Sequence, residues 1–325
     1  MWKSLKDRAE GVKEMKRMKT TEAVGQVLCH DITQIIPGVT KDAVFRKGHI
    51  IREEDIPVLL SVGKDSVYIW ENDETMMHEN DAAEVLYRMT ANEHMHPSDV
   101  KEGKIEAIAD TEGLLKVDRE KLKKVNAFGE MMIATRHGNT VVKKGDKLAG
   151  TRIIPLVIKK DKMQEAEKIC DGTPILKILP FTVKKAAIIT TGNEVYHGRI
   201  KDAFTPVIEQ KIAEFGAEMM FHEIFDDNDR KITDGCLRAI EAGADIVFCT
   251  GGMSVDPDDK TPLAIKNTGA EMISYGSPVL PGAMFLLSYY RKGDKVIPIC
   301  GLPGCAMYNR RTIFDLVLPR LMAAD

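Results

Sequence analysis

Residues 245–261 read DIVFCTGGMSVDPDDKT, a short apolar run that passes directly into two glycines and then into an acidic loop. An apolar run of this length, ended by turn residues, is typical of a strand buried in a parallel sheet. Two other segments repeat the arrangement: residues 183–191, VKKAAIITT, end at Gly192, and residues 295–300, KVIPIC, end at Gly301. We therefore expect strands in 183–191, 245–250 and 295–300.

Helical patterns alternate with these runs. Residues 206–215, PVIEQKIAEF, place Val207, Ile208, Ile212 and Phe215 on one face, and Gly216 follows as a left-handed stop. The remaining expected elements are a strand at 217–225 and helices within 226–242, at 262–268 and at 306–320. Alternation at this spacing predicts a C-terminal doubly wound α/β domain over residues 181–325.

The first 180 residues carry weaker signals. We expect three segments there: an N-terminal extension at 1–19, a mixed α+β module at 20–100, and a β-rich, barrel-like module of glycine-separated strands at 101–180. Helices are expected at 53–62, at 80–91 with Asn80 or Asp81 as N-cap, and at 120–125. Gly172, Pro174 and Pro180 interrupt periodicity, so the boundary with the last domain is expected near 171–180.

Composition narrows the class of protein. The 325 residues contain 46 Lys and Arg against 49 Asp and Glu, a net charge of −3, which argues against a nucleic-acid partner. The longest apolar runs fall far short of the roughly 18 residues that span a membrane, so no membrane partner is expected. Six cysteines without a CxxC pair or a secretory leader indicate reduced thiols and a cytoplasmic protein.

Three glycine-containing loops follow predicted strands. In an open parallel sheet, ligands bind outside the carboxyl ends of the strands, so the loops at 190–195, 250–261 and 301–304 are expected to share one crevice. Glycines let backbone N–H groups approach an anion, and the hydroxyls of Thr190 and Ser254 add donors for phosphate. Taken singly, each glycine pair is also compatible with an ordinary turn.

Carboxylates crowd the same loops. Asp256, Asp258 and Asp259 lie on the central loop, Glu194 on the first, and Asp226 and Asp227 follow the strand at 217–225. Carboxylates packed closely repel one another unless they are protonated, solvated or bound to a cation. A hard cation such as Mg²⁺ is therefore a natural ligand, and a solvated acidic turn is the alternative.

These motifs carry a family resemblance. TGNEV, the glycine and isoleucine of GRI at 198–200, the pair Asp226-Asp227, TGGMSVDPDDKT, Pro281-Gly282 and GLPG follow one another over residues 183–325. In this order they resemble the molybdopterin-binding domain shared by molybdopterin adenylyltransferases, gephyrin-type molybdenumtransferases and competence-damage-inducible proteins. The resemblance implies molybdopterin or adenylyl-molybdopterin as ligand, Mg²⁺ as cofactor and, in metal insertion, molybdate.

The resemblance also implies roles for individual residues. Catalysis would rest on Glu194, Asp258 and Asp259, and a metal would be bound by Asp256, Asp258, Asp259 and Glu194. The implied ligand-binding residues are Thr190, Thr191, Gly192, Asp226, Asp227, Thr250, Gly251, Gly252, Met253, Ser254, Thr261, Pro281, Gly282, Gly301, Pro303 and Gly304.

Three functions stay open at this point. The first is an enzyme of molybdenum cofactor biosynthesis, a transferase of the molybdenumtransferase or adenylyltransferase type, and the intact acidic loop favours it. The second is a non-catalytic carrier or sensor of the cofactor, favoured by the absence of the molybdenumtransferase N-terminal signature between Thr20 and Asn80. The third is a competence-damage-type nucleotide hydrolase. By analogy we expect a homo-oligomer and a molybdoenzyme or biosynthetic partner bound through the N-terminal region.

Overall fold

The computed structural model describes residues 16–36, 40–69, 75–254, 256 and 259–325. Its strands are β1 (Lys16–Lys19), β2 (Ile32–Ile36), β3 (Thr40–Phe45), β4 (Ser66–Ile69), β5 (Met76–His78), β6 (Met95–Pro97), β7 (Lys104–Ala109), β8 (Gly113–Val117), β9 (Met131–Thr135), β10 (Thr140–Val142), β11 (Lys147–Ile153), β12 (Val157–Lys159), β13 (Leu176–Leu179), β14 (Lys185–Thr191), β15 (Glu218–Phe225), β16 (Ile246–Thr250), β17 (Glu271–Tyr275), β18 (Leu286–Lys292) and β19 (Lys295–Leu302).

The α-helices are α1 (Ile56–Ser61), α2 (Glu79–Thr90), α3 (Arg119–Asn126), α4 (Lys160–Cys170), α5 (Asn193–Tyr196), α6 (Phe204–Ala213), α7 (Asp229–Glu241), α8 (Thr261–Asn267) and α9 (Ile313–Met322). Short 3₁₀ turns are η2 (Thr20–Glu22), η3 (Glu53–Asp55) and η4 (Gly304–Ala306). Within the described part of the chain, every helix is too short or too polar to cross a membrane.

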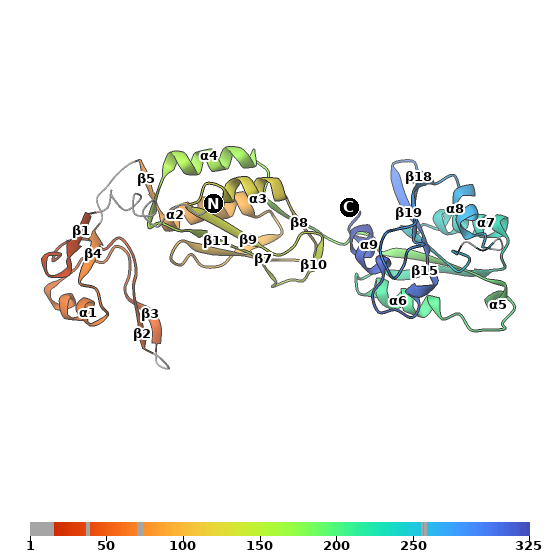
Figure 1. Cartoon of the computed structure of the whole chain (residues 1–325), viewed down its shortest axis with the longest axis horizontal. Helices are drawn as coiled ribbons and strands as arrows, with labels where there is room; N and C mark the ends of the chain where they lie inside the picture. Colours follow the sequence, from red (N-terminus) through yellow and green to blue (C-terminus); the bar gives the residue numbers. More distant parts are fainter. Residues whose placement is uncertain (1–15, 37–39, 70–74, 255, 257–258) are drawn as a thin grey trace. The chain divides into compact units, whose positions relative to one another are not determined.

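The chain divides into two compact units. The N-terminal unit ends at Ile178, and the C-terminal unit comprises residues 179–325 together with two short insertions from earlier in the chain, 112–115 and 139–141. Figure 1 colours the two from red to green and from green to blue. The four sequence-derived segments stay a prediction.

The N-terminal unit begins with small antiparallel pairs. β1 pairs with β4 and β2 with β3, and a cluster of buried side chains that includes Leu28, Leu59 and Val67 packs beside them. The helix predicted at 53–62 is split into η3 and α1. Its first turn is tightened because the Asp55 carboxylate accepts the Arg52 backbone N–H at 2.9 Å and lies 2.6 Å from the His49 ring.

The second half of this unit is an antiparallel sheet covered by helices. The strand order is β6-β7-β11-β9; α2 packs on β7 and β11, α3 packs on β9, and α4 packs against α2 and α3 (Figure 1). The glycine-separated strands expected at 101–180 are present, and a covered open sheet takes the place of a closed barrel. Helix α4 was not predicted, although its buried residues Met163, Ala166 and Cys170 recur at helical spacing.

The start of α2 corrects one sequence-based expectation. His78, and neither Asn80 nor Asp81, is the N-cap: its Nδ1 accepts the Asn80 backbone N–H at 3.2 Å, and its Nε2 lies 2.7 Å from the Cys29 carbonyl. The Asn80 side chain is used elsewhere, since its Oδ1 accepts the Gly103 backbone N–H at 3.0 Å. Burial of His78 lets an imidazole take the role that short polar side chains usually have.

The C-terminal unit confirms the doubly wound prediction. Its sheet has the order β15-β14-β16-β19-β18-β17, in which β15, β14, β16 and β19 are mutually parallel and β18 and β17 extend the sheet antiparallel. The chain passes from β14 to β15 through α5 and α6, from β15 to β16 through α7, and from β16 into α8. The left-handed stop at Gly216 is confirmed by its φ of 66°.

Alternate residues of the central strands face two different cores. Ala186 and Ile188 of β14 pack with α6 and α9 side chains, whereas Ala187 and Ile189 pack with side chains of α7 and α8. This period of two follows from strand geometry. It fixes the next two residues as well: Thr190 continues the α6 side and Thr191 the α8 side.

The C-terminal helix is shorter than predicted. In place of one helix over 306–320, the chain forms η4, a turn, and then α9 from Ile313. Thr312 and Asp315 cause the late start, because the Asp315 carboxylate accepts the Thr312 backbone N–H at 2.7 Å and the Thr312 hydroxyl accepts the Phe314 N–H at 3.2 Å. This reciprocal capping fixes the first turn of α9.

Replacing Phe314 with alanine tests the packing of α9 on the sheet. Phe314 is fully buried, and its ring lies edge-on to that of Phe248 at 5.3 Å between centroids. We expect Phe314→Ala to lower the free energy of unfolding by about 3–5 kcal/mol in urea denaturation. Leu316→Ala, on the same helix but 60% exposed, should change it by less than about 0.5 kcal/mol. Equal effects would contradict this packing.

Candidate functional site

Four strand ends lie side by side at one edge of the C-terminal sheet. Thr191 is the register partner of Phe225, and Thr250 that of both Thr190 and Leu302. Neighbouring strands are about 4.8 Å apart, so the loops that follow β15, β14, β16 and β19 begin next to one another. The three glycine loops expected to meet are therefore brought to a common edge.

Buried threonine hydroxyls fasten two of these loops together. The Thr191 hydroxyl donates to the Thr250 carbonyl at 3.1 Å and lies 3.0 Å from the hydroxyl of Thr261 at the start of α8. All three threonines are at most 3% exposed. The Thr250 hydroxyl is itself buried without a hydrogen-bond partner. Thr191 and Thr261 thus hold the two loops together, and their hydroxyls are already engaged.

The two central glycines are required by this close approach. Gly251 has φ 81°, and a Cβ placed on it would lie 2.1 Å from the Thr191 carbonyl oxygen. Gly252 has φ 54°, and its Cβ would lie 2.9 Å from the Thr261 hydroxyl. Contact between β14 and the loop after β16 accounts for both glycines, because any side chain would separate the segments.

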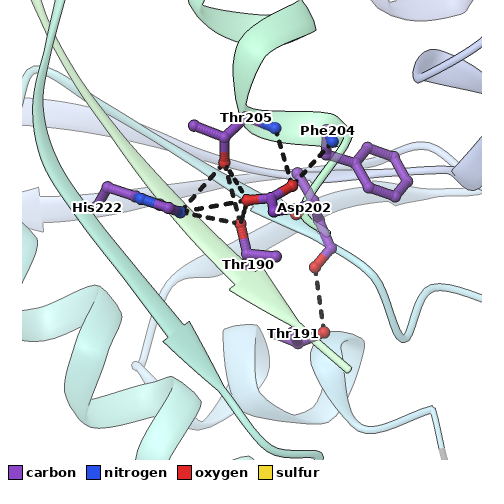
Figure 2. A network of polar contacts seen from close by, with 7 residues as sticks. Thr190, Thr191, Asp202, Phe204, Thr205 and His222 are labelled. Carbon is purple, nitrogen blue, oxygen red and sulfur yellow. Dashed lines mark hydrogen bonds and ion pairs between the residues drawn. The ribbon is translucent and has the colours of Figure 1, made fainter. Parts of the chain in front are cut away.

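Figure 2 shows a polar network beside the first loop. The Thr190 hydroxyl lies 3.0 Å from an Asp202 carboxylate oxygen, 3.2 Å from the Thr205 hydroxyl and 3.2 Å from His222 Nε2. Asp202 Oδ1 also accepts the backbone N–H groups of Phe204 and Thr205, at 2.8 and 3.1 Å. The network ties the chain after TGNEV to β14, β15 and the first turn of α6.

The charge of Asp202 is stabilised within this network. Burial raises the pKa of a carboxylic acid, but here hydrogen bonds from Thr205, Thr190 and Phe204 outweigh it and lower the pKa of Asp202. The sequence-based analysis assigned Thr190 to ligand binding. Thr190 is 1% exposed and its hydroxyl takes part in this network, and its role in ligand binding stays a prediction.

Carboxylates from three loops converge at the same edge. Asp227 accepts the Asn193 backbone N–H at 3.1 Å, which links the end of β15 to α5. Burial, assisted by the negative charges of Glu194, Asp259 and Asp226, raises the pKa of Asp227. The carboxylates of Glu194, Asp259 and Asp226 are therefore near enough for their charges to act on Asp227.

Asp226 joins this group through a lysine. One carboxylate oxygen binds Lys231 Nζ at 2.8 Å, and the other is buried without a hydrogen-bond partner. The same ammonium lies 5.7 Å from the centre of the half-exposed Tyr196 ring. Asp226 is thus partly neutralised, whereas Asp227 is not.

The acidic loop after β16 is folded on itself. The Asp259 carboxylate accepts the Ser254 backbone N–H at 2.7 Å, and the Asp259 N–H donates to the Asp256 carbonyl at 3.0 Å. Asp258 lies outside the described residues. Among the residues that are described, no group of three or more His, Cys, Asp or Glu side chains is arranged to hold a metal ion.

Two further predicted residues pack inside the unit. Met253 is 4% exposed, and its side chain covers Gly301, where a Cβ would lie 2.5 Å from the methionine sulfur. Only the backbone of Met253 is therefore available to a ligand. Tyr275, which sequence analysis missed, donates its hydroxyl to the Met253 and Ser254 carbonyls at 3.3 and 3.5 Å. Burial and the charge of Asp259 raise its pKa.

The loop after β19 has the most open glycine. Gly304 is exposed and its φ is not positive, and a Cβ placed on it would have no atom within 4 Å. Pro303, just before it, is buried. Pro281 and Gly282 lie at the start of α9: the Pro281 carbonyl accepts the Ile313 N–H at 3.1 Å, and a Cβ on Gly282 would lie 2.5 Å from the Ile313 side chain. This segment therefore packs against the first residue of α9.

Asp202, Thr205, His222 and Tyr275 are the polar residues at this edge that sequence reasoning missed. Asp202 follows GRI at two residues and precedes a helix, which is the pattern of an N-terminal cap and could have been recognised. His222 and Tyr275 lie in strands whose faces were assigned only by the folded sheet. No local signal identifies them.

Comparison with known families agrees with this geometry. Residues 187–323 match the family described as "Probable molybdopterin binding domain", and residues 17–71 match DUF8806, a domain of unknown function. The C-terminal unit therefore contains a domain of the molybdopterin-binding family, which confirms the resemblance found in the motifs.

The alignments with individual relatives cover only part of this chain and part of each relative. The Bacillus cereus (strain B4264) protein named competence-damage inducible protein is 30% identical over 129 residues, 40% of this chain and 30% of that protein. Its namesake in Bacillus subtilis (strain 168) is 32% identical over 85 residues, 26% and 20% of the two chains. The chain spans less than a third of the length of either relative.

A similar solved structure covers less than half of this chain but nearly all of its own. The crystal structure of tungsten cofactor synthesizing protein MoaB from Pyrococcus furiosus is 18% identical, covers 44% of this chain and 95% of its own, and has a TM-score of 0.37.

The contact between Gly251 and Thr191 predicts unequal tolerance among the loop glycines. Gly251→Ala should lower the melting temperature by several degrees, since the added methyl would meet the Thr191 carbonyl in a left-handed backbone conformation. Gly304→Ala, with open space and ordinary φ, should leave it within about one degree. Differential scanning calorimetry compares the two, and a stable Gly251→Ala protein would disprove the close approach.

The raised pKa of Asp227 predicts a pH-dependent effect on stability. As pH rises above about 3.8, the unfolded chain ionises Asp227 before the folded chain does, so the folded state loses stability. Asp227→Asn removes this loss and keeps an acceptor for Asn193 N–H. We expect the variant to unfold at higher urea than wild type at pH 7, with the difference shrinking towards pH 4. Asp234→Asn, an exposed residue of α7, is the control.

Proposed function

We propose that this protein binds molybdopterin, free or adenylylated, and acts in molybdenum cofactor biosynthesis. The observation that supports it is the match of residues 187–323 to a molybdopterin-binding family, in a unit whose strand-end loops meet at one edge. The ligand class follows from the family description, and the residues that would hold it are those at this edge.

The loop after β16 is suited to an anion. Its Ser254 N–H already binds a carboxylate oxygen of Asp259 at 2.7 Å, so this amide is oriented towards negative charge. A ligand phosphate would compete with Asp259 for the Ser254 amide and gain the exposed backbone of Gly304 on the neighbouring loop. Glycines 251 and 252 keep the loop close to β14.

The acidic group is suited to a divalent cation. Burial raises the pKa of Asp227, the negative charges of Glu194 and Asp259 raise it further, and a bound cation would relieve this repulsion. We propose Mg²⁺ held by Glu194 and Asp259, with Asp256 and Asp258 of the same loop, and molybdate as a substrate beside it. When bound, Mg²⁺ neutralises charge that develops on a transferring phosphate. Asp259, Asp258 and Glu194 would then be the catalytic carboxylates of a transferase.

Two other functions, a carrier or sensor and a nucleotide hydrolase, are each favoured by one observation. A carrier or sensor uses the same edge without turnover, and the absence of the molybdenumtransferase N-terminal signature between Thr20 and Asn80 favours it. A nucleotide hydrolase is favoured by similarity to competence-damage inducible proteins. We further propose a cytoplasmic homo-oligomer, in keeping with six free cysteines, with a molybdoenzyme or biosynthetic protein as partner of the N-terminal unit.

Calorimetric titration of the whole chain separates these functions. The titrants are molybdopterin and its adenylylated form, each with and without Mg²⁺ and molybdate, and the recovered pterin is analysed for chemical change. AMP release or metal insertion identifies the enzyme, and intact recovered pterin identifies a carrier or sensor. Absence of binding to either form contradicts the proposal.

Asp259→Asn is the sharpest variant for the acidic mechanism. The amide oxygen can still accept the Ser254 N–H, so the fold is retained, but the charge that attracts a cation is lost. We expect Mg²⁺-dependent turnover, or the Mg²⁺ enhancement of ligand affinity, to fall at least about tenfold. Asp294→Asn, an exposed turn residue, should be unchanged. Wild-type behaviour of Asp259→Asn would remove the acidic loop from the mechanism.

A further inference from the structure

The N-terminal unit contains a polar cavity of about 320 Å³. It is lined by Thr33 of β2 and by residues of the segment 98–106, which includes the start of β7. The volume is at the lower end of the range for ligand pockets, about 300–1,000 Å³. Every lining residue is polar or charged, so an apolar ligand would leave these groups without partners. The cavity therefore suits a small hydrophilic ligand.

A tight turn at 101–104 carries part of the lining. Lys101 and Lys104 exchange backbone hydrogen bonds at 3.1 and 3.0 Å, and the φ angles of Glu102 and Gly103 between them are 50° and 67°. Left-handed conformations at both central residues are typical of two-residue hairpin turns. The Gly103 N–H donates to Asn80 Oδ1 at 3.0 Å, and its carbonyl accepts the last N–H of β11 at 2.9 Å. The backbone of the turn is thus held by α2 and β11, which lowers the entropy cost of binding a ligand there.

Three charged groups of the cavity have partners of unequal quality. The Glu106 carboxylate pairs with Lys147 Nζ at 2.8 Å. Glu102 accepts the Thr33 hydroxyl at 3.5 Å, and its other oxygen lies 3.8 Å from Lys104 Nζ. Long contacts between partly exposed groups contribute little free energy. Glu102 and Lys104 can therefore exchange these contacts for stronger ones to a ligand.

Two further charges of the cavity have no partner. The side chains of Asp99 and Lys101 are exposed and form no ion pair or hydrogen bond within the described part of the chain. Ser98, beside Asp99, is fully engaged: its hydroxyl donates to the Asp99 carbonyl at 3.2 Å and accepts the Glu106 N–H at 2.9 Å. The cavity thus offers one unpaired charge of each sign.

The mixture of signs restricts the charge of the ligand. An anion attracted by Lys101 and Lys104 would also meet the carboxylates of Asp99 and Glu102, and a cation attracted by the carboxylates would meet the lysines. A ligand with a single charge is therefore opposed by one half of the lining. A small molecule that carries both charges satisfies both halves with charge-assisted hydrogen bonds.

We propose that this cavity binds a zwitterion of the amino-acid class with a polar side chain. Lys101 and Lys104 bind its carboxylate, and Asp99 and Glu102 bind its ammonium group. Thr33 belongs to the segment 17–71 that matches the domain of unknown function, whereas the other lining residues precede or begin β7. The bound zwitterion therefore joins these two parts of the N-terminal unit. The proposal does not depend on the pterin function, because all of its residues belong to the N-terminal unit.

Three matched ligands and three variants test the cavity in the full-length chain. L-Glutamine carries both charges, N-acetyl-L-glutamine lacks the ammonium group, and L-glutamine methyl ester lacks the carboxylate. The variants are Lys101→Gln, Asp99→Asn and, as a control, Lys144→Gln, an exposed lysine of the turn before β11. Saturation-transfer NMR at about pH 6, where the amine of the ester is protonated, gives the Kd of each pair. Melting temperatures verify that the variants are folded, as expected for exposed side chains.

We expect wild type to bind L-glutamine with a Kd below about 1 mM and each blocked analogue at least about tenfold more weakly. Lys101→Gln should weaken L-glutamine binding by at least about threefold and bring the methyl ester to within about twofold of it. Asp99→Asn should do the same for N-acetyl-L-glutamine, because the group that repels the carboxylate is removed. Lys144→Gln should match wild type.

Three results would overturn the zwitterion site. The first is the absence of saturable L-glutamine binding to wild type. The second is binding of either blocked analogue as tightly as L-glutamine, which would identify a site for one charge only. The third is L-glutamine binding that Lys101→Gln and Asp99→Asn leave unchanged, which would place the ligand elsewhere on the protein. The same variants should titrate with molybdopterin as wild type does, so either proposal can fail while the other stands.

Discussion

The close approach of Gly251 to the Thr191 carbonyl is the constraint on which the site depends. Where a Cβ would lie 2.1 Å from that oxygen, only glycine permits the loop after β16 to return against β14. The Thr191 hydroxyl then reaches both the Thr250 carbonyl and Thr261, which fixes the start of α8. With the loop so held, Ser254 presents its amide to Asp259, and Asp259 comes within the field of Asp227.

Parallel strands give this edge its range of chemistry. Because β15, β14, β16 and β19 all end there, each contributes a loop with different side chains. The first three bring carboxylates, and the last brings Tyr308 and arginines. Opposite charges on adjacent loops would attract each other if they touched, yet Arg310 and Arg311 have no carboxylate partner among the described residues. The separation leaves both charge types available to a ligand.

Sequence patterns predicted the C-terminal unit well because its signals are local. Buried parallel strands read as continuous apolar runs, and β14, β16 and β19 were found within two residues of their ends. The antiparallel strands β17 and β18 were missed, since β17 is exposed at every residue and carries no alternation. Helix α4 was also missed, although its buried residues recur at helical spacing. Contacts between residues far apart in sequence could not be predicted either. The Thr190 hydroxyl, for example, lies beside His222, which is 32 residues away in sequence.

The carboxylates around Asp227, which include Glu194 and Asp259, fit a functional role better than a role in stabilising the fold. A carboxylate whose pKa is raised by burial and by neighbouring negative charges destabilises the folded chain near neutral pH. Asp226 shows how the protein could have neutralised such a charge, since Lys231 pairs with it at 2.8 Å. No equivalent cation is paired with Asp227 among the described residues. Carboxylates that repel one another without a cation of the protein beside them are typical of cation-binding sites, because the bound cation offsets the electrostatic cost.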